Sequence, residues 1–245
     1  MSKRYQKALD AINEQHVLLV YPIKNAREPR SLWHSLHPRS AMRWDWSEDA
    51  DQRVVDLWHL KDDLCVGRQV VYAKWFRGRA TFFSRAIFAP MLALLGTTRA
   101  EALRRNGNAG RIYEELLDNS PQTPRRLRQA ADLAGSHNRS DYEHGLRLLW
   151  EQLVIVGTGE VDEGQFPALA MGATRHVLED LWEEADGIAP RDAEERCRSL
   201  LPAESPFSGF LDRLLRKFPC RSSRPDCEHA GLARLRRGSS HGMGR

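Results

Sequence analysis

The chain has 245 residues, of which 41% are hydrophobic and 29% are charged, the composition of an ordinary soluble globular protein. Its longest apolar run, residues 86–95, is much shorter than the roughly twenty residues of a membrane-spanning helix, so we expect no transmembrane segment. The formal net charge is +4, but the first 212 residues carry a net charge of −3. A uniformly basic surface is therefore excluded, and an anionic partner would need local patches or the C-terminal segment.

The first predicted elements are three helices, at residues 3–15, 31–37 and 49–61. The first of them is polar and contains no apolar segment that could serve as a signal peptide. Residues 64–100 then contain no Asp or Glu but six Lys or Arg. Within this stretch, segments 68–76 and 79–84 are rich in β-branched and aromatic residues and flank Arg77-Gly78, which predicts a β-hairpin.

This hairpin has the composition of a DNA-binding wing. Its basic side chains are Arg68, Lys74, Arg77 and Arg79, and we expect them to face phosphate. Such contacts supply affinity and register but little sequence information. The aromatic residues of the hairpin are expected to hold it against its own helices.

Residues 109–185 give the clearest pattern of elements. A helix at 111–119 is followed by Thr123-Pro124, a cap residue and a first-turn proline that begin a second helix. Ser140 and Glu143 have the spacing of a capping box, which predicts the start of a third helix. Short strands at 154–156 and 166–171 follow, separated by a loop with three glycines: Gly157, Gly159 and Gly164.

Three short helices followed by a hairpin is the order of a winged helix-turn-helix, whose third helix enters the DNA major groove. The expected contacts of this second unit are Arg125, Arg126, Arg128, His137, Asn138, Arg139 and Arg147. Asn and Arg side chains can bond bidentately to adenine and guanine. Equally, the spacing of Arg139, Glu143 and Arg147 fits an ordinary salt-bridged helix surface, and the arginines of the second helix fit a solvated face.

The C-terminal part is predicted as two short amphipathic helices at 191–201 and 207–218, followed by a basic disordered tail. The tail serves either solubility or binding. The four cysteines show no disulfide framework: Cys65, Cys197, Cys220 and Cys227. Reduced thiols and a cytoplasmic location follow as expectations. The spacing of Cys220, Cys227, His229 and His241 departs from zinc-site patterns, so neither a metal nor another cofactor is expected.

Together these elements predict a mainly α fold with small β-hairpins, of the α+β class, arranged as a tandem winged helix-turn-helix. The expected organisation has four parts: an N-terminal winged-helix-like domain at 1–106, a second winged-helix domain at 107–190, C-terminal helices at 191–218 and the tail at 219–245. Double-stranded DNA is the expected partner. A protein partner or a homodimer is also compatible with the sequence.

Four segments carry a family resemblance: LWHLKDDL (57–64), YAKWFRGRATFFS (72–84), IYEELLDNSPQTPRRLRQAADL (112–133) and LVIVGTGE (153–160). They resemble the AlkZ-related, YcaQ-like winged-helix proteins over roughly residues 5–185. The best-known members are DNA glycosylases that unhook interstrand crosslinks and excise bulky alkylated bases. The resemblance implies a tandem winged-helix body with duplex DNA as its ligand.

The resemblance does not extend to the glycosylase site. Members of the family position the hydrolytic water with a Gln-x-Gln or Gln-x-Asp motif, and none of the eight glutamines here has Gln or Asp two positions on. Where the family would place the motif, the chain reads LVYPIKNAREPRSLW (19–33). The catalytic residues are therefore unknown. The candidate replacements are Tyr21, Asn25, Glu28 and Asp45.

Three functions remain open. We favour a DNA-binding protein on the glycosylase-related scaffold without the standard site. An active DNA glycosylase with a rearranged site and a winged-helix protein-interaction module are the alternatives. The first third of the chain also contains five tryptophans: Trp33, Trp44, Trp46, Trp58 and Trp75. Most are expected in the core, although one of them could wedge into an opened duplex.

Overall fold

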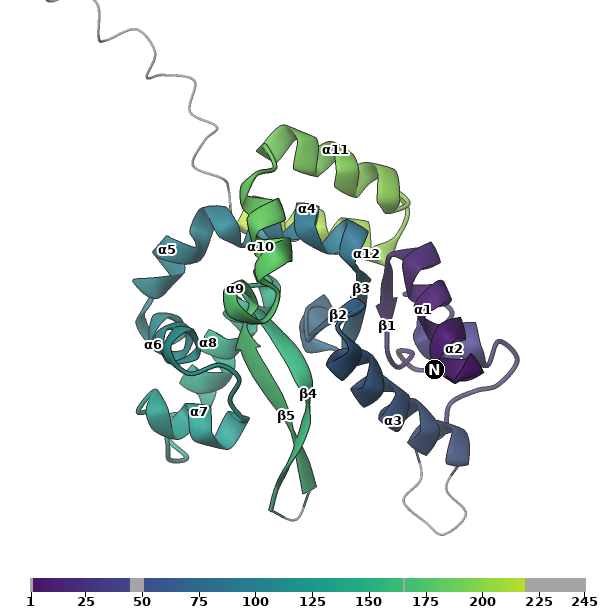
Figure 1. The fold of residues 1–245 in the computed structure, drawn as a ribbon, viewed down its shortest axis with the longest axis horizontal. Helices are drawn as coiled ribbons and strands as arrows, with labels where there is room; N and C mark the ends of the chain where they lie inside the picture. Colours follow the sequence, from purple (N-terminus) through teal and green to yellow (C-terminus); the bar gives the residue numbers. More distant parts are fainter. Residues whose placement is uncertain (1, 45–50, 165, 219–245) are drawn as a thin grey trace, which may run out of the picture.

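A computed structural model describes residues 2–44, 51–164 and 166–218 of the protein (Figure 1). The predicted tail at 219–245, with its cysteines and histidines, lies outside these residues, and so do Asp45 and Trp46. Within the described residues the structure is mainly helical, with one small antiparallel sheet, which confirms the predicted fold class. No helix in these ranges combines the length and the apolar character needed to cross a membrane.

The first part of the chain follows the predicted order. It contains α1 (Lys3–Gln15), β1 (Val17–Leu19), α2 (Leu32–Leu36), α3 (Gln52–Gly67), β2 (Val70–Ala73), the 3-10 turn η1 (Phe76–Gly78) and β3 (Thr81–Ser84). The hairpin doubles back as expected, with Val70 opposite Ser84 and Ala73 opposite Thr81. Its turn requires positive φ at Arg77 and at Gly78. Strand β1, which the sequence did not indicate, pairs with β3.

The central part contains α4 (Arg85–Leu95), η2 (Thr97–Arg99), α5 (Ala100–Arg104), α6 (Gly107–Asp118), α7 (Pro124–Ala130), α8 (Arg139–Glu151), β4 (Ile155–Glu163) and β5 (Phe166–Ala173). The predicted order of three helices and a hairpin is thus confirmed in α6–α7–α8–β4–β5. Thr123 caps α7 by accepting a hydrogen bond from the backbone N–H of Arg126 at 3.4 Å. The last elements are α9 (Thr174–Val177), α10 (Glu179–Asp186), α11 (Pro190–Leu200) and α12 (Pro206–Lys217), of which α11 and α12 match the predicted helices.

Two local predictions are wrong. The capping box predicted from Ser140 and Glu143 does not form, because α8 begins at Arg139 and its N-cap residue is Asn138. Glu143 instead accepts a hydrogen bond from the Arg139 side chain at 2.8 Å. Gly157 and Gly159 lie inside β4 rather than in a loop. Gly157 has no room for a side chain, since an added Cβ would lie 2.5 Å from the Tyr72 ring, and Gly159 has φ 123° at a β-bulge.

Within the described residues, five strands form one antiparallel sheet in the order β1-β3-β2-β4-β5. Strands β2 and β4 meet at the pair Tyr72–Gly157, which joins the two hairpins edge to edge. In Figure 1, β4 and β5 project between α1–α3 on one side and α6–α8 on the other. The first hairpin is therefore an inner part of a sheet, not a free wing, because β1 and β4 cover both its edges.

The aromatic residues of the first hairpin pack against the C-terminal helix rather than only against their own helices. The Trp75 and Phe210 rings lie edge to face with centroids 4.8 Å apart, and Phe76 contacts Phe207 and Phe210 at 5.1 Å. Trp75 and Phe76 are almost completely buried. Helix α12 thus packs against Trp75 and Phe76 at the start of the turn, whereas Arg77, Gly78 and Arg79 stay exposed.

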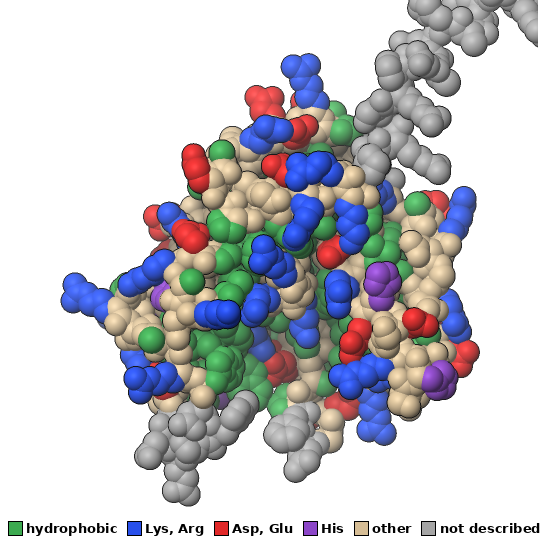
Figure 2. All heavy atoms as spheres, turned by 180° about the vertical axis from the view of Figure 1, so that it is seen from behind, with side chains coloured by type: hydrophobic (Ala, Val, Ile, Leu, Met, Phe, Trp, Pro, Cys, Tyr) green, Lys and Arg blue, Asp and Glu red, His purple; other side chains and the backbone are tan. Residues whose placement is uncertain are grey.

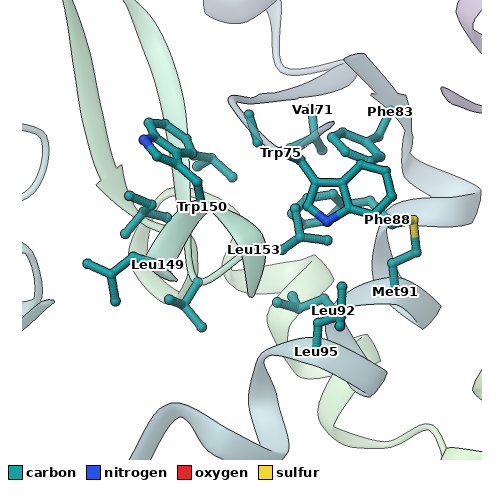
Figure 3. Close-up of a cluster of buried hydrophobic side chains, with 14 of the residues drawn as sticks. Val71, Trp75, Phe83, Phe88, Met91, Leu92, Leu95, Leu149, Trp150 and Leu153 are labelled. Atoms are coloured by element: carbon teal, nitrogen blue, oxygen red, sulfur yellow. The ribbon is translucent and has the colours of Figure 1, made fainter. Parts of the chain in front are cut away.

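Helix α4 is the centre of the core. Residues 86–95 are apolar on every face, the pattern of a helix buried all round, and Pro90 lies inside the helix. Figure 3 shows the side chains of Met91, Leu92 and Leu95 beside Trp75 and Leu153. One hydrophobic cluster contains residues from all three predicted folded segments. The proposed boundaries at 106 and 190 stay predictions, since the core continues across them.

Candidate nucleic-acid interface

A polar cluster lies where α3 meets β4. Glu160 of β4 accepts a hydrogen bond at Oε1 from the Trp58 indole N–H, 2.8 Å away, and the same oxygen accepts from the ammonium group of Lys61. The two charged side chains are only 16% and 8% exposed. The backbone N–H of Glu160 also donates to Asp62 Oδ1 at 2.5 Å. Helix α3 and strand β4 are therefore joined by a buried, hydrogen-bonded ion pair.

The β-bulge explains why Glu160 points at α3. The register of β4 against β5 passes from Gly157–Met171 to Gly159–Ala170, which leaves one residue of β4 unpaired. An extra residue in a strand reverses the face toward which the following side chains point. Gly159 provides the positive φ that this irregularity requires.

Lys74 follows β2 and lies near the same ion pair. Lys74 is the first residue after β2, and Tyr72, two residues before it, packs in the cluster formed by α1 and α3. The Lys74 side chain is exposed. Nevertheless, desolvation of its amine lowers its pKa, the nearby Lys61 ammonium lowers it further, and Glu160 acts in the opposite direction.

Tyr21 completes this group from the other side. It follows β1, is half-buried, and meets the Trp44 ring edge to face at 5.0 Å. Burial raises the pKa of its phenol, and the negative charge of Glu160 raises it further. We call Tyr21, Trp58, Lys61, Lys74 and Glu160 the junction cluster, because they lie where the two hairpins join.

Exposed apolar side chains flank the junction cluster. Trp44, beside Tyr21, is 53% exposed. Val66 on α3 is 63% exposed and lies over Gly159, since an added Cβ there would come within 3.0 Å of its Cγ2. Val161, next to Glu160 in β4, is 42% exposed. The junction cluster thus combines a largely buried charged centre with exposed apolar side chains at its margin.

The basic residues of α7 have unequal environments. Arg125 is exposed and has no ion pair among the described residues. Arg126 lies 3.8 Å from Glu163 at the end of β4, which partly neutralises it. Arg128 donates to the carbonyl of Gly135 at 2.9 Å and lies over the Tyr142 ring at 5.3 Å, so it holds the turn after α7.

The predicted contact residues on and just before α8 also differ in their environments. His137 and Arg147 are exposed. The Asn138 side-chain amide donates to the carbonyl of Ala134 at 3.2 Å, within the turn. Arg139 pairs with Glu143, which is the salt-bridged helix surface that the spacing had left open.

The basic residues of the first hairpin lie at its two ends. At one end, Arg68 donates to the carbonyl of Val177 at 3.5 Å. At the other, Arg77 lies over the Phe76 ring at 5.2 Å and Arg79 is exposed. Figure 2 shows Lys and Arg side chains along the middle of one face, above a hollow between the two halves of the molecule. Lys74 is the predicted residue that joins the junction cluster.

The candidate replacements for the missing glutamine motif also differ in what they contact. Asn25 bonds both backbone groups of Met42, donating to O at 3.0 Å and accepting from N at 2.7 Å, so it fastens a loop. Glu28 is exposed and pairs with Arg30. Tyr21 is the described candidate that lies in the junction cluster. Sequence reasoning missed Lys61 and Glu160, and the glycines around the bulge were the one signal that β4 bends there.

The model of the AlkZ-related family matches residues 2–205 of the chain. Neither the curated proteins nor the solved structures gave a match.

Proposed function

The chain belongs to the AlkZ-related family, and from this premise we propose that it is a duplex-DNA-binding protein on a tandem winged-helix scaffold, without the glutamine motif of the glycosylases. The observation that carries the proposal is the repeated arrangement of helices followed by a hairpin, with the two hairpins joined in one sheet. In the proposed scaffold α3 and α8 are the recognition helices. The basic face in Figure 2 supports an anionic ligand.

The partners of each basic residue indicate which ones bind phosphate. Arg125 and Arg147 keep exposed guanidinium groups beside the β4–β5 hairpin unit. Arg128 is held by Gly135, and Arg126 is near a carboxylate. We therefore assign phosphate contacts to Arg125 and Arg147, and structural roles to Arg128 and Asn138.

Fluorescence anisotropy with a labelled duplex at two or more salt concentrations tests this function. We expect binding that weakens with salt, with a log–log slope of several ions. Arg125→Ala should weaken binding to all sequences alike and reduce the slope by about one. Arg198→Ala is the matched control, because this exposed arginine pairs with Glu194 on the distant α11 and should leave binding unchanged. Absence of binding at low salt would refute the proposal.

A second function, an active DNA glycosylase with a rearranged site, is favoured by the junction cluster. The negative charge of Glu160 contributes to the raised pKa of the Tyr21 phenol, and Tyr21 lies in the segment where the family places its motif. Release of 7-methylguanine, or unhooking of a crosslinked duplex, is the test. Unchanged substrate after long incubation with excess protein would exclude it. A stable dimer or protein complex that does not shift DNA would instead indicate an interaction module.

A further inference from the structure

We infer that helix α12 extends the nucleic-acid interface with a second phosphate-binding surface. On this surface, Arg213 of α12 and Arg77 of the first hairpin bind backbone phosphates of the same duplex that α8 contacts. The inference rests on the proposed function, since it requires that the protein binds duplex DNA. Helix α12 (Pro206–Lys217) begins directly after residues 2–205, which the family model matches, so this surface is an addition to the shared scaffold.

The position of α12 is fixed by its apolar face. Phe207, Phe210, Leu211 and Leu214 are buried along one side of the helix. The rings of Phe207 and Phe210 each lie 5.1 Å from the Phe76 ring, edge to face. Helix α12 is therefore held against the first hairpin where the chain enters η1, and this packing sets the direction of its exposed side chains.

The two flanks of α12 face different elements. On one flank, Asp212 and Leu215 line a cleft against α11. Residues 213 and 217 share the other flank, because residues four apart lie above one another on a helix. Lys217 on this flank forms an ion pair with Glu151 of α8 at 2.7 Å. Arg213 therefore lies on the side of α12 that faces α8 and η1, away from α11.

Helix α8 joins this surface to the interface proposed above. It packs against η1 and is tied to α12 by the ion pair, so each of the three elements contacts the other two. Arg147 precedes Glu151 by four residues on α8, and Arg213 precedes Lys217 by four residues on α12. Each arginine thus lies one helical turn from the ion pair that links the helices. Arg147, to which a phosphate contact is already assigned, makes the two surfaces continuous.

Two guanidinium groups lie on neighbouring aromatic rings. Arg77 lies over the Phe76 ring at 5.2 Å, and Arg213 lies over the Phe210 ring at 4.7 Å. The two rings are themselves 5.1 Å apart. A stacked guanidinium uses its flat face, so the N–H groups at its edge stay free to bind phosphate oxygens in pairs. Stacking also restricts the side chain before the ligand arrives, which reduces the entropy lost on binding.

These cations are available to a ligand. Arg77, Arg147 and Arg213 are exposed, and none of them forms an ion pair with a described residue. In Figure 1, α12 passes behind α4, so it belongs to the side of the molecule that Figure 2 shows, where Lys and Arg side chains gather along the middle. Unpaired cations on one face attract the phosphate backbone without reading its sequence.

The acidic residues closest in sequence to Arg147 and Arg213 are engaged elsewhere. On α8, Glu143 pairs with Arg139 and Glu151 pairs with Lys217. On α12, Asp212 lies on the flank toward α11. The surface formed by η1, α8 and α12 therefore keeps a positive charge.

Fluorescence anisotropy of the full chain with a labelled duplex, over a series of salt concentrations, tests the inference. Arg213→Gln removes the charge and keeps part of the stem over the Phe210 ring. We expect weaker binding at low salt and a log–log slope reduced by about one, as for a lost phosphate contact. Adding Arg77→Gln should reduce the slope by about two in total. Arg198→Gln is the matched control, because this exposed arginine lines the cleft between α11 and α12 and pairs with Glu194, so the slope should not change.

Two further measurements separate the possible outcomes. Thermal melting of every variant checks that it is folded, and Arg213→Lys, which keeps the charge, should keep the wild-type slope. A role of Arg213 in packing alone would lower the Tm of Arg213→Gln and leave the slope unchanged, and this result overturns the inference. A wild-type slope in the folded double variant, with weaker binding by Arg125→Ala, also overturns it and leaves the proposed function intact. Absence of duplex binding by folded wild type overturns both.

Discussion

Adding one methyl group to Gly157 should destabilise the junction between the two hairpins. Gly157 pairs with Tyr72 across β4 and β2. A Cβ at this position would lie 2.5 Å from Cδ1 and 3.0 Å from Cε1 of Tyr72, and 3.2 Å from Cδ1 of Leu169. The Tyr72 ring is buried and cannot swing into solvent. The backbone of Gly157 does not have positive φ, so the effect comes from crowding alone.

The size of the effect follows from overpacking. Inserting a methyl group into a packed core costs about 1–3 kcal/mol in the free energy of unfolding. For a chain of this length, each kcal/mol lowers the Tm by about 2–4 °C. Gly157→Ala should therefore lower the Tm by about 2–12 °C, by direct product of the two ranges.

Thermal and urea unfolding of the purified variants measure this effect. Gly209→Ala is the matched control, because Gly209 is exposed within α12 and an added Cβ would meet nothing within 4 Å. It should raise stability by about 0.5–1 kcal/mol through its better helix propensity. A Gly157→Ala protein that unfolds at the same temperature and urea concentration as the wild type would refute the close approach of β2 and β4.

Three further experiments, two with variants and one on the unchanged protein, test the packing and the ion pair. Phe210→Ala should lower the free energy of unfolding by about 3–5 kcal/mol, because it removes the ring that packs against the first hairpin. Near-ultraviolet circular dichroism should report the changed environment of the tryptophan. An unchanged Tm would contradict this prediction. Lys61→Met should lower the free energy of unfolding by about 3 kcal/mol, because Glu160 is left buried without its cation. In urea unfolding, the double variant with Glu160→Gln should regain most of this loss. A double variant no more stable than the single one would argue against the ion pair. Burial raises the pKa of the Cys197 thiol to about 12, and the charge of Glu194 contributes to this rise. Peptide mapping should therefore show slow alkylation of Cys197 at pH 8 in the native protein and fast alkylation in urea. Rapid alkylation of the native protein would be inconsistent with burial of the thiol.

The site was predictable from the sequence only in part. Composition identified a cation-rich, acid-free hairpin, and Lys74 belongs to it. The charge pattern did not distinguish Arg125, which stays exposed, from Arg128, which is held by Gly135 and Tyr142. Which arginine is engaged depends on the neighbours that the folded chain provides. Spacing along a helix leaves that choice open, as it did for Arg139.

The sequence by itself determined the local elements: the helices at 3–15, 191–201 and 207–218, the two hairpins and the cap at Thr123. Their signals are hydrophobic periodicity and turn chemistry, which act over a few residues. The tertiary structure decided how these elements meet. Helix α4 is apolar on every side, so its sequence has no period that marks a buried face. Lys61 and Glu160 lie 99 residues apart in the chain, and only the joining of β2 to β4 at Gly157 brings their charges together.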